Sequence, residues 1–309
     1  MAMAKKFISQ EHSTQTGGRG IKDGTRKSRA GSIFATAFFG LAIIFGVGLI
    51  AFTAIFFYSD VDGTSMMKTL NASGVNTDSV LVKRGDDAKR GDIIVVQHYD
   101  SSGNKKALHI KRLLATEGDT IYFERSAHNG AEYPNFPDGR YYYKIHINGV
   151  AYDTINAGKY HIYDEYEAQV AGTGEWTQGW MRGSDIYDKF YNFILTGNHY
   201  FSAPGSRTDA LFRTHAADNT PFRVYNNQES RWEIKLPKGY MFYMGDNRGN
   251  DDLNPATGST FGMSSDCTNY GPQPRSHLVG VAVDHASGKS APEWFFSKII
   301  EIVTFGFVK

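Results

Sequence analysis

Two residues of this chain have the types needed for nucleophilic hydrolysis, a serine and a lysine. Ser65 lies in a Gly-Thr-Ser turn segment, and Lys111 lies in the apolar, strand-like run 109–114. A serine hydroxyl needs a neighbouring base to become a nucleophile, and a lysine whose amine is kept neutral by desolvation can serve as that base. We therefore predict that Ser65 is a nucleophile and Lys111 its general base, in a fold that brings them together.

A long apolar segment precedes the serine. No charged residue occurs between Ala30 and Ser59. At ~1.5 Å per residue, a helix of this length crosses ~30 Å of hydrocarbon. The segment exceeds the roughly 7–15 apolar residues of a cleavable secretory signal, and it has no small-residue exit site. A helix that is apolar on all faces fits a membrane better than a soluble core. We predict an uncleaved transmembrane helix over residues 32–58.

The charges on either side of this helix predict its orientation. Residues 1–31 are basic and rich in Ser, Thr and Gly, as expected of a flexible tail, and Asp60 and Asp62 follow the helix. Cationic flanks remain in the cytoplasm. We therefore place the tail inside and residues 59–309 outside the plasma membrane. The cationic residues of the tail are Lys5, Lys6, Arg19, Lys22, Arg26, Lys27 and Arg29.

The composition of the chain argues against several classes of protein. The net charge is only +1, which does not favour bulk electrostatic capture of nucleic acid. Cys267 is the only cysteine, so the exported part cannot contain an internal disulfide. The histidines are scattered, without a paired metal-ligand spacing. We predict no metal, no cofactor and no nucleic-acid partner.

Residues 59–309 are typical of a mostly β domain. Short runs of β-branched and aromatic residues alternate with Gly-Asp turns, and Asn148-Gly149 is a strong hairpin signal. No long amphipathic helix is expected among them. The segment at about 125–230 is rich in Tyr, Gly, Asp and Asn, and we interpret it as an inserted subdomain or hairpin excursion. The expected strands are 79–83, 92–97, 109–114, 120–123, 142–147, 232–236, 240–244 and 277–283.

The C-terminal tail from Pro292 to Val308 is apolar but contains Lys298 and Glu301. It is too short and too charged for a second membrane span. An interfacial amphipathic helix and a helix docked on the core are both consistent with it.

Several ordered segments of this chain resemble blocks of the bacterial type I signal peptidases. These are membrane-anchored Ser/Lys proteases that remove signal peptides from exported proteins. The order and spacing of the blocks make the resemblance specific. It implies a mostly β, signal-peptidase-like catalytic domain with an inserted subdomain, preceded by one transmembrane helix. The matching segments are 63–70 for the nucleophile block, 90–96 for a Gly-Asp strand block, 111–119 for the lysine block, 245–248 for Gly-Asp-Asn-Arg, and 270–272 with 278–280 for its continuation.

The resemblance also implies supporting residues. Ser264 would hydrogen-bond to the lysine and orient it, and Asp266 matches the aspartate of the same block. Asp246 and Arg248 are expected to brace the site as a charge pair.

Met66 and Met67 follow the nucleophile directly. Both could fill the core, but we expect one of them to line the substrate cleft.

The chain departs from the family pattern at several positions. Lys68 stands where the family usually has proline, which shapes the turn after the nucleophile. Gly63 provides no hydroxyl for the oxyanion, which would depend on backbone N–H groups such as that of Ser65. Residues 251–263 look like a loop insertion, and after it Cys267 and Thr268 replace a Ser-Arg pair.

We predict that the protein is a membrane-bound serine endopeptidase that removes signal peptides from exported preproteins. The predicted partners are these preproteins and membrane lipid. Two alternatives remain open. One is a related Ser/Lys protease dedicated to a single pilus or conjugation precursor, which the breadth of cleaved preproteins would distinguish. The other is a catalytically silent, membrane-anchored binding protein.

Overall fold

The computed structural model describes residues 25–63, 65–66, 69–70, 78–99, 103–125, 141–151, 181–182, 185–197, 222–246 and 266–303. An apolar helix is followed in these ranges by two antiparallel sheets and a few short helices. The prediction of a mostly β chain preceded by one apolar helix is confirmed. The helix and the β-rich part form two separate units and are described separately here.

Helix α1 (Thr25–Ile55) contains the apolar segment. Its stretch Gly31–Ile55 is long and apolar enough to cross a membrane, with a mean hydropathy of 2.5 and no burial inside the protein. Residues 56–58, which we placed at the end of the transmembrane helix, begin strand β1 (Phe56–Asp60) instead. Aromatic residues favour extended backbone where a partner strand is present, and every residue of β1 pairs with β2.

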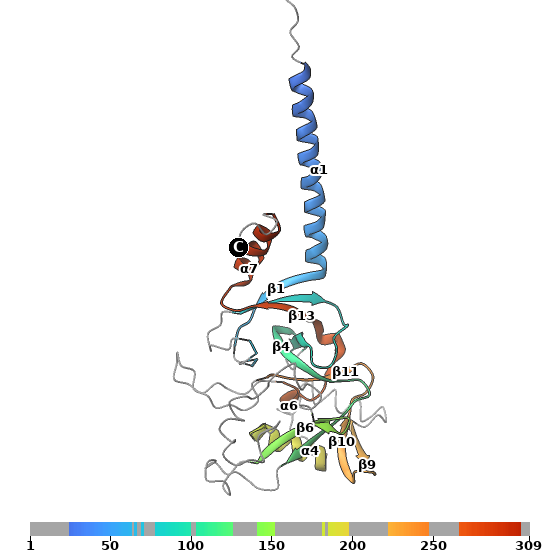
Figure 1. Cartoon of the computed structure of the whole chain (residues 1–309). Helices are drawn as coiled ribbons and strands as arrows, with labels where there is room; N and C mark the ends of the chain where they lie inside the picture. The colour runs from blue at the N-terminus through green and yellow to red at the C-terminus, as the bar shows by residue number, and fades with distance from the viewer. Residues whose placement is uncertain are drawn as a thin grey trace, which may run out of the picture. The chain divides into compact units, whose positions relative to one another are not determined.

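The first sheet contains the strand of the candidate base Lys111, and it also contains strand β1, after which the candidate nucleophile Ser65 follows in a turn. Its strand order is β1-β2-β13-β3-β4-β11-β12, and each neighbouring pair is antiparallel. The long strand β4 therefore lies near the middle, between β3 and β11 (Figure 1). The bounds of the strands after β1 are Ser79–Arg84 for β2, Leu278–Ala286 for β13, Ile93–Tyr99 for β3, Lys105–Thr116 for β4, Tyr240–Met244 for β11 and Gln273–Pro274 for β12.

Gly280 is required at the centre of this sheet. It pairs with Arg84 of β2 on one side and with Val95 of β3 on the other. A Cβ atom at this position would lie 2.2 Å from the carbonyl oxygen of Lys83. Only glycine therefore lets β13 approach β2 this closely.

The second sheet begins where β4 turns back at Glu117-Gly118-Asp119. Its order is β7-β6-β5-β10-β9, and β8 pairs with β6. The described strands of segment 125–230 join this sheet, with β6 pairing with β5, β9 with β10, and β7 and β8 with β6. The strand bounds are Thr120–Arg125 for β5, Tyr142–Ile147 for β6, Val150–Ala151 for β7, Met181–Arg182 for β8, Arg223–Asn226 for β9 and Arg231–Lys235 for β10.

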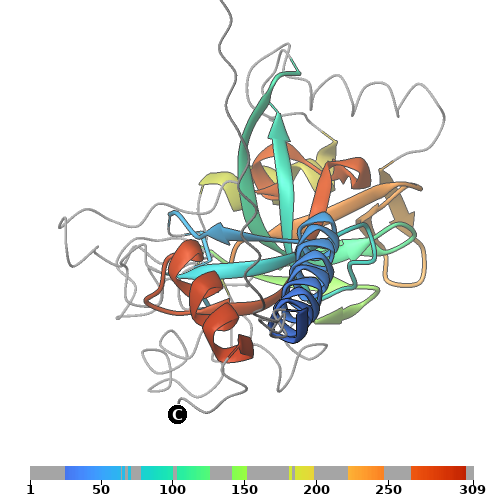
Figure 2. The same cartoon turned by 90° about the horizontal axis from the view of Figure 1, so that it is seen from above.

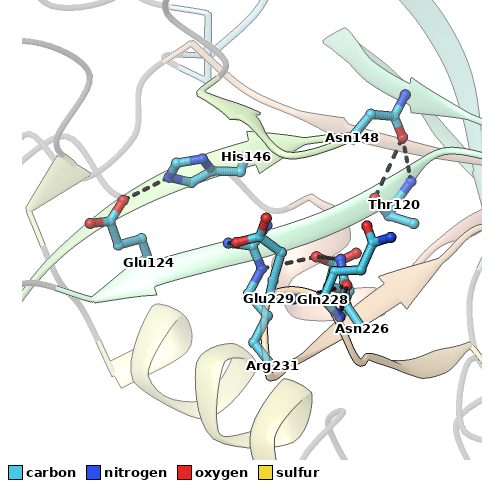
Figure 3. A network of polar contacts seen from close by, with 9 residues as sticks. Thr120, Glu124, His146, Asn148, Asn226, Gln228, Glu229 and Arg231 are labelled. Atoms are coloured by element: carbon cyan, nitrogen blue, oxygen red, sulfur yellow. Dashed lines mark hydrogen bonds and ion pairs between the residues drawn. The ribbon is translucent and has the colours of Figure 1, made fainter.

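A network of polar contacts on the second sheet supports its turns (Figure 3). The hairpin predicted at Asn148-Gly149 is confirmed, since it joins β6 to β7 with φ angles of 53° and 78°. The Asn148 side chain accepts a hydrogen bond from Thr120 N at 2.8 Å. On the neighbouring strands, His146 Nε2 lies 2.7 Å from Glu124 Oε2. These contacts fix the geometry of β5 and β6.

The main core lies where both sheets meet helix α4 (Asp185–Thr196). The ring centroid of Phe190 on α4 lies 4.9 Å from that of Phe123 on β5 and 5.6 Å from that of Phe242 on β11. All three side chains are fully buried. This helix was not expected from the sequence, and it ties the second sheet to the strands of the first.

A smaller core lies beside the turn that contains Ser65. Val61, Met66 and Leu70 pack there with valines of β2 and β3. Beside it, α6 (Cys267–Tyr270) and the 3-10 turn η2 (Arg275–His277) lead back into β13. Helix α7 (Ala291–Val303) then lies against β1 and β2 (Figure 2).

Candidate active site

Ser65 and Lys111 meet at the surface of the first sheet. The Nζ atom of Lys111 lies 2.7 Å from the Oγ atom of Ser65, which is hydrogen-bond distance. Lys111 belongs to β4, where it pairs with Ile94 of β3. The serine lies in the segment that follows β1, so two regions far apart in the sequence supply the pair.

Local turns position the serine. Gly63 has φ of +85°, a left-handed conformation that glycine adopts without strain, and it redirects the chain after β1. Val61 N donates to Asp78 O at 2.8 Å, which fastens the start of the turn. After the serine, the amides of Thr69 and Leu70 both donate to Met66 O, at 3.0 and 2.8 Å. The nucleophile candidate is thus held between two hydrogen-bonded turns.

The environment of Lys111 favours its neutral form. The side chain is only 3% exposed, and burial lowers its pKa from 10.5 to about 8. The carboxylates of Asp266 and Asp246 oppose this shift, but desolvation is larger. In the described part of the chain, the amine contacts Ser65 Oγ and the carbonyl of Ile110, at 2.7 and 3.0 Å. A neutral amine at this position can accept the hydroxyl proton.

A pocket of about 120 Å³ opens beside the pair. Its wall combines apolar side chains of β2, β3 and β4 with polar residues of the β1 segment. A pocket of this kind can receive a small side chain next to the serine. The lining residues are Ser59, Asp60, Val61, Asp62, Ser65, Val80, Val95, Leu108, His109, Ile110 and Lys111.

His109 is the pocket residue nearest to the lysine on the same side of β4. Its ring stacks on that of His98 with centroids 4.7 Å apart, and His98 in turn contacts Tyr270 at 5.0 Å. Burial, followed by the charges of Lys111 and His98, lowers the pKa of His109 to about 4. The imidazole is therefore neutral at neutral pH and adds no positive charge to the site.

Arg112, the residue after the lysine, forms a buried ion pair with Asp246. Its Nε and Nη2 atoms donate to the two carboxylate oxygens at 2.8 and 2.5 Å, and Nη1 donates to Gly91 O at 2.8 Å. Both side chains are almost fully buried. Thr69 Oγ1 also donates to Asp246, at 2.5 Å. The carboxylate therefore joins β4 to the segment that carries Ser65.

Asp266 holds the neighbouring backbone in place. It accepts hydrogen bonds from Thr268 N and Thr268 Oγ1 at 3.0 and 2.8 Å and from Gly245 N at 3.1 Å. Burial raises the pKa of Asp266, while these donors oppose the shift. The residue caps α6 and fastens that helix to the Gly245-Asp246 segment.

Cys267 is fully buried, and its sulfur accepts a hydrogen bond from Tyr243 N at 3.3 Å. Burial raises the pKa of the thiol well above its usual value. A protonated, inaccessible thiol fills space in the core.

The structure brings together some of the predicted site residues. Ser65 and Lys111 are in contact, and the charges of Asp246 and Asp266 act on the lysine. Met66, a candidate for substrate binding, is 1% exposed, belongs to the smaller core and does not line the pocket. Met67, Arg248 and Ser264 lie outside the described residues.

Arg112 and Thr69 were not selected from the sequence, although both contact Asp246. The sequence feature that could have identified Arg112 was its position in the strand. A charged residue next to a buried lysine, inside an apolar strand, needs an anionic partner on the other side of the strand. Nothing in the sequence pattern indicated that the partner would be Asp246.

Within the ranges that the structure describes, no group of three or more His, Cys, Asp or Glu side chains is placed to hold a metal ion.

A serine hydroxyl thus lies against a buried amine in the β-rich domain, and a helix long and apolar enough to cross a membrane precedes this domain in the sequence. The family model for signal peptidase, peptidase S26, matches residues 33–252, well over half of the chain. The chain belongs to this signal peptidase family, which implies a peptidase acting on preproteins with signal peptides.

One solved structure to which the chain is similar is a signal peptidase I from Enterococcus faecalis V583. The sequence identity is 15%, the match covers 64% of this chain and 97% of that one, and the TM-score is 0.27. A comparison with curated proteins found no match.

Proposed function

We propose that the protein is a membrane-bound serine endopeptidase that removes N-terminal signal peptides from exported preproteins. Ser65 is the nucleophile and Lys111 is the general base. The observation that carries the proposal is the 2.7 Å contact between Lys111 Nζ and Ser65 Oγ, made by an amine that is 3% exposed. Family membership supports the substrate class.

Acylation follows from this geometry. Neutral Lys111 accepts the hydroxyl proton as Ser65 Oγ attacks the scissile carbonyl carbon. The oxyanion that forms needs oriented donors, and we assign this role to backbone N–H groups, chiefly that of Ser65. The C–N bond then breaks, and the ammonium of Lys111 returns the proton to the leaving amine.

Deacylation repeats the sequence with water. Lys111 accepts a proton from a water molecule that attacks the acyl carbon, and the ester bond to Ser65 breaks. The proton returns to the serine oxygen, which restores the free enzyme. In this scheme Ser264 orients the lysine, and Asp246 and Asp266 hold the surrounding backbone rather than act on substrate. Arg248 braces the same segment.

The pocket beside the pair fits the residue before the cut. Val80, Val95 and Ile110 provide apolar walls, and the volume is only about 120 Å³. An extended substrate alternates its side chains, so the residues one and three before the cut point the same way. We expect Ala, Gly or Ser at these positions. Met66 supports this wall from beneath, and Met67 stays a candidate for direct contact.

We propose that the anchor holds the site on the side of the membrane where signal peptides emerge. We propose that α1 crosses the plasma membrane with residues 1–31 in the cytoplasm, because cationic flanks stay inside. The catalytic domain then lies on the outer face. Preproteins and lipid are its partners, and the proposal requires no metal or cofactor.

The test is processing of a preprotein by the full-length, detergent-solubilised protein. Substrates with Ala, Phe or Lys immediately before the cut are compared, with the alanine substrate expected to be processed far faster. Equal processing of all three would contradict the small pocket.

Ser65→Ala should be inactive, while Ser276→Ala and Lys235→Ala, at exposed positions, should retain activity. A Ser65→Ala protein that still processes the alanine substrate would overturn the assignment of the nucleophile.

A further inference from the structure

The last helix of the domain, α7, is fastened to the strand that follows the apolar helix. Asp60 Oδ1, at the end of β1, accepts a hydrogen bond from Ala291 N at 2.5 Å and another from Ser79 Oγ at 2.9 Å. Ser290 and Glu293 form a cap at the same end, with Ser290 Oγ donating to Glu293 Oε2 at 2.9 Å. The start of α7 is therefore fixed to β1.

Aromatic contacts complete this attachment. The ring centroid of Tyr58 on β1 lies 5.0 Å from that of Trp294 and 5.5 Å from that of Phe295, both edge to face. Trp294 is 4% exposed. One side of α7 is thus packed on the domain.

Another side of α7 is apolar in sequence, and Phe296 is its residue whose exposure the structure describes. Phe296 is 61% exposed. In the sequence, residues 296, 299, 300 and 303 are all apolar and recur at helical spacing, so their positions share one side of the helix. Lys298 and Glu301 occupy positions on the opposite side, at about 100° per residue. This pattern is typical of a helix lying in a membrane surface.

The connection to α1 identifies what covers this side. Helix α1 ends at Ile55 and β1 starts at Phe56, with no linker between them. Consecutive Cα atoms are about 3.8 Å apart, so the Cα of Tyr58 lies within about 11 Å of that of Ile55. The ring of Tyr58 touches α7. If Ile55 is at the membrane surface, the first turn of α7 must lie close to the same surface.

We propose that α7 lies in the membrane–water interface, with the side that contains Phe296 in contact with lipid. The inference rests on the proposed role of α1 as a membrane anchor. It gives the domain a second contact with the bilayer, which restricts its rotation about the anchor. Lipid, rather than a protein partner, is favoured because α7 is tied directly to the residues that follow the apolar helix.

The experiment uses the full-length protein in vesicles of phosphatidylcholine and phosphatidylglycerol. Single cysteines at Phe296→Cys, Ile43→Cys and Val150→Cys are labelled with an environment-sensitive fluorophore. Quenching is measured with nitroxide lipids labelled at the headgroup, high on the acyl chain or near its end. Cys267 is fully buried, so the labelled unaltered protein gives the background. Val150 is the matched control, an exposed apolar residue of β7 on the second sheet.

We expect position 296 to be quenched by headgroup and upper-chain nitroxides, position 43 by nitroxides near the chain end, and position 150 by neither. Quenching at 43 without quenching at 296 would overturn the interfacial position and leave the anchor intact. Quenching at 296 mainly by chain-end nitroxides would also overturn it, since α7 would then be inserted. Absence of quenching at 43 would instead refute the anchor on which the inference rests.

Discussion

The two sides of strand β4 handle a buried positive charge in opposite ways. Lys111 and Arg112 are adjacent, and both are at most 3% exposed. The amine of Lys111 contacts a serine hydroxyl and a backbone carbonyl, and burial lowers its pKa to about 8. The guanidinium of Arg112 is held by both oxygens of Asp246. One cation can lose its proton, while the other is permanently paired.

This difference shows how a strand can carry both chemistry and its support. A buried charge without a carboxylate partner is costly, and lysine reduces that cost by becoming neutral. Arginine cannot do so, and it requires an anion. Asp246 meets this need and also accepts from Thr69 next to the nucleophile turn. The ion pair between Arg112 and Asp246 therefore stabilises the backbone around Lys111 and Ser65.

The largest expected effect is on catalysis. Ser65→Ala and Lys111→Met should each lower kcat/KM by a factor on the order of 10⁴ to 10⁶, because the members of such a unit act together. Processing of a model preprotein measures the loss. Lys235→Met, at an exposed lysine of β10, is the matched control and should keep its activity. Substantial turnover by a folded Lys111→Met protein would remove the lysine from its assigned role.

Breaking the ion pair between Arg112 and Asp246 should mainly lower the stability of the folded protein. Arg112→Met leaves the Asp246 carboxylate buried without the Arg112 guanidinium, which should lower the free energy of unfolding by about 3–5 kcal/mol. Denaturant unfolding of the full-length protein in detergent measures the change. The double variant Arg112→Met/Asp246→Asn removes both charges and should recover part of the loss. A double variant less stable than the single one would argue against a simple ion pair.

Removing the charge of Lys111 should instead raise the free energy of unfolding at neutral pH. The pKa of Lys111 is about 8 in the folded protein and near 10.5 when unfolded. Below pH 8, folding must bury a protonated amine, so Lys111→Met should raise stability there. At about 1.4 kcal/mol per pKa unit, the gain is on the order of 3 kcal/mol.

This gain should fall progressively as the pH rises from 8 toward 10.5. Unfolding curves of the Lys111→Met variant and of the unaltered protein, measured at several pH values, test whether the substitution raises the free energy of unfolding. Lys111→Met less stable than the unaltered chain at neutral pH would mean that the amine has a charged partner.

A smaller effect on stability and rate is expected from removing the hydrogen bond between Thr69 and Asp246. Thr69→Val removes the donor to Asp246 while keeping the shape of the side chain. Loss of one hydrogen bond to a charged group should cost about 1.5 kcal/mol. A modest fall in kcat should accompany it, because the turn that carries Ser65 is less well fixed. Unchanged stability and unchanged rate would show that this link is dispensable.

The sequence predicted the elements better than their packing. Eight strands, the apolar helix and the contact between Ser65 and Lys111 followed from periodicity, turns and ordered segments, whereas strand β1 and the short strands β7, β8, β9 and β12 were not expected. Helix α4 was missed because its apolar positions occur in a segment dominated by Tyr, Gly, Asp and Asn. The end of α1 was placed three residues late, since Phe56, Phe57 and Tyr58 are equally apolar whether they enter lipid or pair with β2.

The sequence also did not indicate which residues pair with the buried charges. The resemblance implied a charge pair between Asp246 and Arg248, which lies outside the described residues, and gave no sign that Asp246 also pairs with Arg112 on a strand far away in sequence. Such pairings depend on sheet order, which local patterns do not specify. Met66 was ambiguous for a related reason. Its type fits both a cleft and a core, and only the path of the turn placed it in the smaller core.

The most direct test of the central claim, that Lys111 acts as the base for Ser65, is the pH dependence of kcat/KM. The rate should rise with pH through an apparent pKa of about 8, because only the neutral amine can accept the proton. His109→Asn should keep this limb, since the pKa of His109 is about 4. A profile that is flat from mildly acidic to alkaline conditions, or a limb that disappears in His109→Asn, would contradict the account.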